Sequence, residues 1–241
     1  MQRQVHANAS ELAAAAAALI AEQAGLAIAA RGQFNIALSG GSTPLSAYQH
    51  LAAPPHQESV DWSRVHIFWS DERCVPPEHA DSNYGAAKAA LLDHVRIPAA
   101  NIHRMHGELP PAQGAEEYRQ QLSTHFETPM FPTFDLILLG LGTDGHTASL
   151  FPGSAALRTG EVPVTENYVA SLESWRLTFT LPLINAARLV VFLVSGANKA
   201  SIVQEIFESG GRPLPAKAVN PHSGGLTWLL DAEAASSLPA D

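Results

Sequence analysis

Cysteine, basic residues and long apolar runs are all scarce in this chain of 241 residues. The single cysteine, Cys74, excludes an intrachain disulfide and fits a reducing compartment, so we expect a cytoplasmic protein. Lysines and arginines number 14 against 23 acidic residues, and the formal net charge of −9 argues against a nucleic-acid surface. An anionic ligand must therefore be bound by a few local cationic groups, because the overall field repels it.

The longest apolar stretch near the start covers residues 12–21 and is shorter than the roughly 20 residues that cross a bilayer. A signal peptide is the alternative, because Arg3 precedes this alanine-rich run. Acidic residues flank the run, however, and Ser10 is typical of a helix N-cap. We therefore expect a helix over residues 10–30 that packs on the domain, and no membrane partner.

Apolar residues make up 46% of the chain and charged residues 15%, which is ample material for a buried core. Internal repeats and low-complexity linkers are lacking, so we expect one domain over residues 1–241. Strand-like and helix-like segments alternate, which predicts an α/β fold of the Rossmann-like type: a doubly wound, mainly parallel sheet with helices on both faces. The expected strands are 34–39, 65–70, 134–140, 176–181, 189–195 and 226–230, and the expected helices are 10–30, 43–51, 82–95, 113–126 and 197–208.

A glycine-rich turn follows the first of these strands, where ligands of such sheets bind. Glycines allow the backbone to approach an anion closely, and the first N–H groups of the next helix lack intrahelical partners. Gly40, Gly41, Ser42 and Thr43 are therefore candidate phosphate-binding residues. Two alternatives are an ordinary strand-to-helix turn and a relaxed nucleophile elbow in which Ser39 attacks a carbonyl.

A second motif, Asp144-Gly145-His146, leaves the most apolar strand. Imidazole titrates nearest neutrality and can take a proton from water and return it, while Asp144 could orient the ring. Residues two apart meet only if Gly145 lets the backbone turn. The alternative is an aspartate turn with a histidine at the start of the next helix.

Three cationic residues at strand ends are candidates for binding an anion. Arg73 could hold a phosphate or stabilise a developing oxyanion, and Lys199 supplies a point charge after a strand–glycine–helix turn. Arg176 is the weaker candidate. The alternatives are an ion pair of Arg73 with its acidic neighbours and a solvated lysine.

Eleven histidines raise the question of a metal site. None of them falls in an HExxH-like spacing, and Cys74 has no partner cysteine. His103 and His106 lie in a segment that looks extended or looped, which would turn them to different faces. We expect no required metal and no cofactor.

Taken together, the motifs resemble the 6-phosphogluconolactonase family over most of the chain. The matching segments are LSGGSTP at 38–44, SDERCVP at 70–76 with SNY at 82–84, IPAANIHRM at 97–105, LGLGTDGHTASLFP at 139–152, RLTFTLPLIN at 176–185 and SGANKA at 195–200. The resemblance implies hydrolysis of 6-phospho-D-glucono-1,5-lactone to 6-phosphogluconate in the oxidative pentose phosphate pathway. It also implies a small-molecule sugar-phosphate partner, and we expect a monomer.

Glucosamine-6-phosphate deaminase is the nearest alternative, because it shares the GGSTP turn and the DGH core. It places a glutamate five residues after the histidine, where this chain has Phe151. Ring opening and proton transfer between carbons need that additional carboxylate, whereas a lactone needs only activated water. A non-catalytic sugar-phosphate-binding module is a third possibility, although the chain lacks a helix-turn-helix segment.

Overall fold

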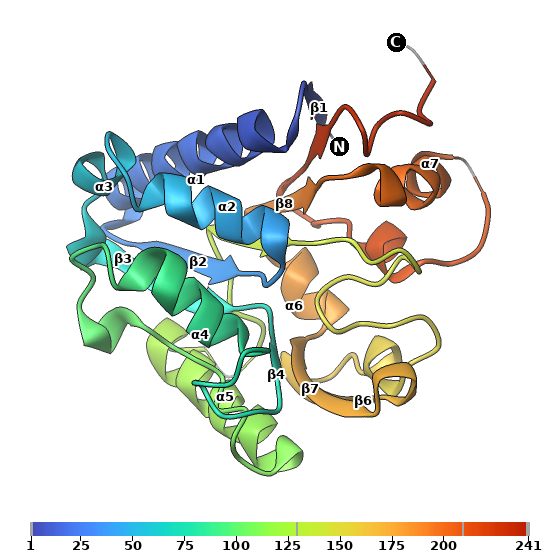
Figure 1. Ribbon diagram of the computed structural model, residues 1–241. Helices are drawn as coiled ribbons and strands as arrows, with labels where there is room; N and C mark the ends of the chain where they lie inside the picture. The colour runs from blue at the N-terminus through green and yellow to red at the C-terminus, as the bar shows by residue number, and fades with distance from the viewer. Residues whose placement is uncertain (1, 129, 209, 240–241) are drawn as a thin grey trace.

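The computed structural model describes residues 2–128, 130–208 and 210–239, and its central feature is a six-stranded sheet in which every pair of neighbours is parallel (Figure 1). In spatial order the strands are β1 (Gln2–His6), β9 (Gly225–Asp231), β8 (Leu189–Val194), β5 (Leu136–Leu139), β2 (Phe34–Leu38) and β3 (Val65–Trp69). A second, antiparallel sheet contains β4 (Asp71–Arg73), β7 (Ser174–Phe179) and β6 (Val164–Val169). The predicted α/β class with a parallel sheet is confirmed.

Helices cover both faces of the main sheet, and the burial of alternate strand residues divides the core in two. Ile36 and Leu38 face one side, where they pack with α1 (Ala9–Arg31) and α2 (Ser42–Leu51). Ala37 faces the other side, which is covered by α5 (Pro111–Phe126), α6 (Leu181–Asn185) and α7 (Ala200–Phe207). Both sides are apolar, as expected for strands buried on both faces.

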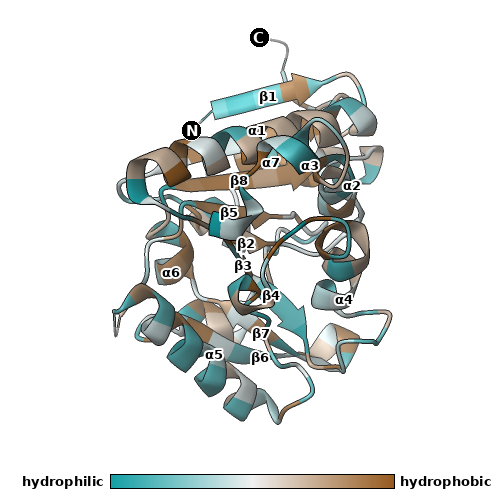
Figure 2. Ribbon diagram, turned by 90° about the vertical axis from the view of Figure 1, so that its left-hand side faces the viewer, coloured by the Kyte–Doolittle hydropathy of each residue, from teal (hydrophilic) through white to brown (hydrophobic). Residues whose placement is uncertain are grey.

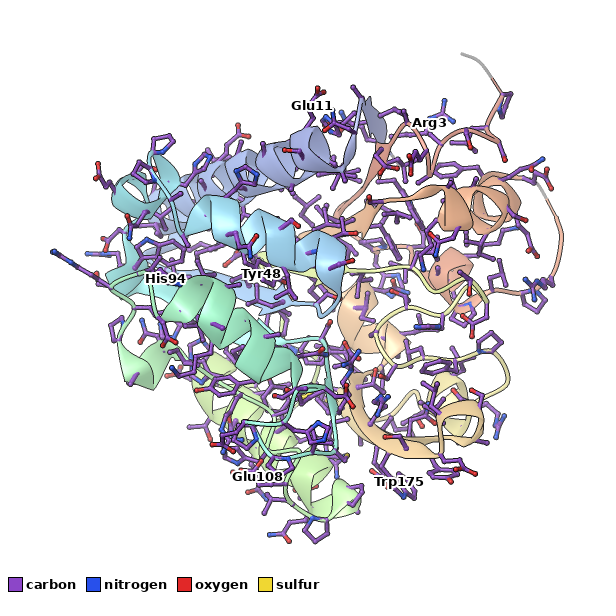
Figure 3. The ribbon with its side chains drawn as sticks, viewed as in Figure 1. Arg3, Glu11, Tyr48, His94, Glu108 and Trp175 are labelled. Atoms are coloured by element: carbon purple, nitrogen blue, oxygen red, sulfur yellow. The ribbon has the colours of Figure 1, made fainter. Side chains whose placement is uncertain are left out.

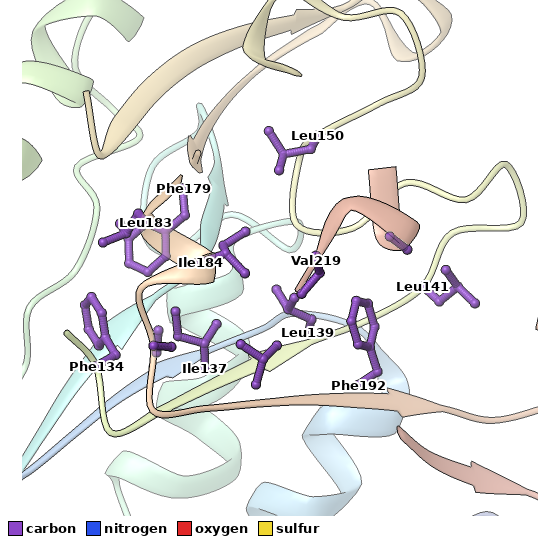
Figure 4. Packing of buried hydrophobic residues seen from close by; sticks show 14 of the residues in the cluster. Phe134, Ile137, Leu139, Leu141, Leu150, Phe179, Leu183, Ile184, Phe192 and Val219 are labelled. Atoms are coloured by element: carbon purple, nitrogen blue, oxygen red, sulfur yellow. The ribbon is translucent and has the colours of Figure 1, made fainter. Parts of the chain in front are cut away.

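Figure 4 shows the second side at close range, where aromatic and branched side chains of β5, β8 and α6 interdigitate. Ile137, Leu183 and Ile184 are completely buried there. Burial of one such side chain contributes about 1.5–3 kcal/mol to folding. This buried packing fixes strands β5 and β8 relative to the helices that cover them.

Helix α1 is long and apolar enough to cross a membrane by length and composition alone. In the structure, Leu12, Ala16 and Ile20 belong to the core cluster that α1 shares with β2 and α2. The helix begins after Asn8, whose side chain accepts from the N–H of Glu11 at 2.9 Å. The expected N-cap, Ser10, lies inside the helix, so that prediction was wrong by two residues.

Several other predicted elements change in the structure. Residues 82–95 form α4 (Asn83–Ala87) and a wider turn over Lys88–Leu92 instead of one helix. The strand expected at 176–181 is β7, which belongs to the small antiparallel sheet. The polar strand β1, which was not among the expected strands, pairs with β9 and forms an edge of the main sheet. Figure 2 shows β1 at the top of the molecule. The remaining helix, α3 (His56–Ser59), is a single turn.

The small sheet is joined to the main one through Ser70. Its backbone N–H and hydroxyl both donate to the carbonyl oxygen of Leu38, at 2.8 and 3.0 Å. β4 follows immediately and pairs with β7. This connection carries the 71–73 segment past the carboxyl end of β2, where the glycine-rich turn begins.

Candidate active site

A pocket of about 250 Å³ lies beyond the carboxyl ends of β2, β5 and β8. It is the position that ligands occupy in open parallel sheets. Seven of the nine predicted site residues line it, although they come from four separate segments: Gly40, Gly41, Ser42, Thr43, Arg73, His146 and Lys199. Asp144 and Arg176 are absent from the lining and adjoin it through His146 and Arg73.

The turn between β2 and α2 brings the start of a ten-residue helix to the pocket. Its N-cap is Gly41, so no side chain caps the helix, and φ of 104° is a conformation that favours glycine. The partial positive charge and unpaired N–H groups of a helix start favour an anion. Tyr48 on α2 (Figure 3) accepts from the N–H of Ser39 at 3.0 Å and donates to its carbonyl at 2.8 Å, which holds the turn in place.

Asp144 and His146 form a hydrogen-bonded pair at the end of β5. Asp144 Oδ1 lies 2.6 Å from His146 Nδ1 and also accepts from the His146 backbone N–H at 3.1 Å. Gly145 has φ of 84°, so the predicted turn between the two side chains is present. A carboxylate can only accept, so in the neutral ring Nδ1 carries the hydrogen and Nε2 has the lone pair. This is the state that a general base requires.

Two neighbouring residues constrain the position of the pair. The ring of Phe151 stacks on His146 at a centroid distance of 4.1 Å. Gly142 passes so close that a Cβ there would lie 2.0 Å from His146 Nδ1. Burial by itself would raise the pKa of Asp144, but the His146 backbone N–H and the imidazole lower it overall. Asp144 is therefore kept as the carboxylate that orients the ring.

Arg73 lines the pocket from β4, where its backbone is held by its neighbour Glu72. The buried Glu72 carboxylate accepts from the N–H groups of Arg73 and Asn83, both at 2.7 Å, and so ties β4 to the start of α4. Burial raises the pKa of Glu72, and these N–H donors oppose the rise. Arg73 donates from Nη1 to the Asp81 carbonyl at 2.7 Å, while its Nε is buried and has no hydrogen-bond partner among the residues that the structure describes.

Lys199 reaches the pocket from the turn after β8. Asp231 organises this turn: it accepts from Ser195 Oγ at 2.6 Å and from the N–H of Gly196 at 3.1 Å. Burial lowers the pKa of Lys199, and the negative charge of Asp144 opposes that effect. Both Lys199 and His146 line the pocket.

Arg176 lies beside Arg73, because the two residues are Cα partners across β4 and β7. Its Nη1 donates to Ser174 Oγ and to the Trp175 carbonyl. Burial lowers the pKa of Arg176, and the like charge of Arg73 lowers it further. An anion bound between two such guanidinium groups would relieve their repulsion.

Asp71 and Asn83 also line the pocket, and neither was predicted as a site residue from the sequence. Asp71 accepts from Ser149 Oγ at 2.8 Å, which joins β4 to the segment after His146. Asn83 donates to the Asp71 carbonyl at 2.9 Å, and its side chain fills the space next to Gly40. Both residues belong to the family motifs at 70–76 and 82–84, which could have identified them. Their distance from the glycine-rich turn in the sequence gives no indication that they lie beside it.

Residues 7–228 match the family described as glucosamine-6-phosphate isomerases/6-phosphogluconolactonase. The chain is 50% identical over 218 residues to the 6-phosphogluconolactonase of Synechocystis, with 88% of each chain covered. It is 39% identical to the human 6-phosphogluconolactonase, with 97% of this chain and 92% of that protein covered. The solved 6-phosphogluconolactonase of Trypanosoma brucei superposes with a TM-score of 0.86 at 31% identity, covering 99% and 98% of the chains.

The fold and pocket thus define a sugar-phosphate enzyme of the isomerase and lactonase superfamily. Within it, this chain belongs to the 6-phosphogluconolactonase family.

Proposed function

We propose that this soluble enzyme hydrolyses 6-phospho-D-glucono-1,5-lactone to 6-phosphogluconate with water activated by His146. The observation that carries the proposal is the convergence of an anion-binding helix start and a carboxylate-oriented imidazole in one pocket. The relatives at 39–50% identity, which are 6-phosphogluconolactonases, support the same substrate. We further propose that the enzyme acts as a monomer in the cytoplasm, and the single cysteine fits that reducing compartment.

In this mechanism the 6-phosphate rests on the turn 40–43, and binding it places the lactone carbonyl near His146. His146 Nε2 takes a proton from water, and the water oxygen forms a bond to C1. A cationic group stabilises the oxyanion of the tetrahedral intermediate. The bond from C1 to the ring oxygen then breaks, and His146 returns the proton to that oxygen. Atoms and charge balance without a cofactor.

The proposal is tested by generating the lactone from glucose 6-phosphate and following 6-phosphogluconate against the spontaneous rate. The His146→Ala variant should lower kcat by about 10²–10⁴, the usual size of general acid–base catalysis. His222→Ala, which removes an exposed histidine, is the matched control and should retain full activity. Wild-type hydrolysis no faster than the spontaneous rate would leave a non-catalytic binding module as the function.

The same kinetics assign the two cations that line the pocket, Arg73 and Lys199. A group that binds phosphate equally in the ground and transition states raises KM when removed, whereas one that contacts the oxyanion lowers kcat. We expect Lys199→Met to act mainly on KM and Arg73→Met mainly on kcat. The reverse pattern would exchange the two roles.

Phe151 is the residue that argues against deaminase activity. Its ring covers one face of His146 where the deaminases carry the additional glutamate. Incubation with glucosamine 6-phosphate should release no ammonia. Ammonia release at a rate comparable to lactone hydrolysis would contradict the assignment.

A further inference from the structure

A cluster of three histidines lies outside the pocket, on the α5 side of the main sheet. His66 comes from β3, His103 from the loop that follows Ala99–Asn101, and His125 from the last turn of α5. One ring nitrogen of each lies within 4.8 Å of those of the other two. All three side chains are half-buried, so they are ordered by the fold and still reachable from solvent.

The closest pair already has the spacing of two ligands on one ion. His66 Nδ1 and His103 Nε2 lie 3.2 Å apart. Two nitrogens bound to zinc at about 2.0–2.1 Å in tetrahedral geometry are separated by about 3.3 Å. In the absence of an ion, one ring donates a hydrogen bond to the other. A change of tautomer in the donor ring exposes both lone pairs without changing the net charge.

The backbone around His103 is fixed independently of any ligand. Its N–H donates to the Ile67 carbonyl at 2.8 Å, and its carbonyl accepts from Tyr118 Oη at 3.0 Å. The ring stacks on Phe68 at a centroid distance of 4.2 Å with an interplanar angle of 6°. Side chains held in this way lose little conformational entropy when they bind an ion.

His125 is oriented by Asn35, which is the Cα partner of His66 across β2 and β3. Asn35 Oδ1 accepts from His125 Nε2 at 2.7 Å. Nε2 then carries the hydrogen, and Nδ1 keeps the lone pair. Histidine ligands of metals are regularly held by such a hydrogen bond from the other ring nitrogen.

A surface hollow adjoins the cluster and leaves room for a further ligand. His103 and His125 line it together with polar side chains of α5, namely Glu117, Gln120, Gln121 and Thr124. Water or one of these oxygen atoms could take a fourth coordination position, as at zinc sites with three histidines. The net charge of −9 also favours cations near the surface.

We propose that His66, His103 and His125 form a binding site for a divalent cation of the zinc class, separate from the lactonase pocket. Imidazole nitrogens suit zinc, cobalt, nickel and copper rather than magnesium or calcium. His66 is near the amino end of β3, and Ser70 at the carboxyl end is about 13 Å away at about 3.3 Å per residue. The ion joins β3, the 103 loop and α5, so its effect is on stability and not on catalysis.

Cobalt(II) is the probe for the first test, because its visible absorption reports coordination by imidazole nitrogens. Chelator-treated protein should bind one cobalt ion per chain, and zinc should displace it. His103→Ala and His125→Gln should each weaken cobalt binding by at least about tenfold, as should Asn35→Ala through loss of ring orientation. His50→Ala, which removes an exposed histidine of α2, is the control and should bind as wild type does.

A second readout uses only the wild-type chain and does not depend on the folding of variants. In ¹⁵N NMR spectra, zinc should shift the imidazole resonances of the three clustered histidines and leave the resonances of His146 unchanged. It should also raise Tm, because an ion that binds only the folded state stabilises it. The proposal is overturned if wild-type protein binds no cobalt, if the variants bind as tightly as wild type, or if zinc shifts the His146 resonance instead.

Discussion

His146 and the cluster of His66, His103 and His125 show how one side chain is prepared for two kinds of chemistry. His146 faces a carboxylate at 2.6 Å, which fixes the position of the hydrogen on its ring. The clustered rings face each other, an amide and Phe68, and burial with mutual repulsion lowers the pKa of His103 and of His125 to about 4. The first environment suits proton transfer, and the second disfavours the charged form of the imidazoles, as cation binding through ring nitrogens requires.

The largest effect that sharpens this comparison is expected from Asp144→Asn. An amide can donate to Nδ1, which places the hydrogen on Nε2 and removes the base. We expect kcat to fall by about 10² with little change in far-ultraviolet circular dichroism. Asp93→Asn, at an acidic residue paired with Lys88 on the surface, is the control. Equal activity of Asp144→Asn and wild type would show that the carboxylate does not orient the ring.

Gly142→Ala tests the same pair by displacement rather than by charge. The new Cβ would meet His146 Nδ1 at 2.0 Å and Asp144 Oδ1 at 2.6 Å, so one of them must move. Because misplacement of a catalytic group by about 1 Å can cost up to 10²-fold, we expect kcat to fall about tenfold or more. Gly160→Ala has open space around its Cβ and should be neutral. Stopped-flow or coupled assays of both variants make the comparison.

His103→Ala should separate the two histidine environments. We expect kcat within about twofold of wild type, because the cluster does not line the pocket. Loss of the stacked ring beside Phe68 should lower Tm, and zinc should no longer raise it. Parallel measurement of kcat and of Tm with and without zinc checks both statements. A fall in kcat as large as that of Asp144→Asn would contradict the separation.

The smallest effect concerns pH and stability. The pKa of Asp144 is below its ordinary value of 3.8 in the folded chain. Its carboxylate therefore adds stability above about pH 4, and this contribution is lost as the pH falls through the lowered value. Because the side chain is 45% exposed, we expect no more than about 2 °C in Tm. The advantage of wild type over Asp144→Asn should shrink between about pH 5 and pH 2, and a constant difference would contradict the assignment.

The sequence alone predicted the class of fold and most of the candidate site, for reasons of local chemistry. β5 and β8 are short, continuous apolar segments, and such segments are typical of strands that a parallel sheet buries on both faces. Gly41 and Gly145 marked turns that only glycine readily adopts, and both have positive φ. Because these motifs end parallel strands, their meeting at one edge followed from the topology.

Tertiary contacts decided the rest. β1 has too few apolar residues to be recognised, and it is a strand because β9 offers it an edge. β4 exists because β7 pairs with it, and that pairing sets Arg73 beside Arg176. The cluster of His66, His103 and His125 follows no recognisable spacing in the sequence, because its members come from a strand, a loop and a helix. Distances between residues far apart in the chain are set by packing, and no local pattern contains them.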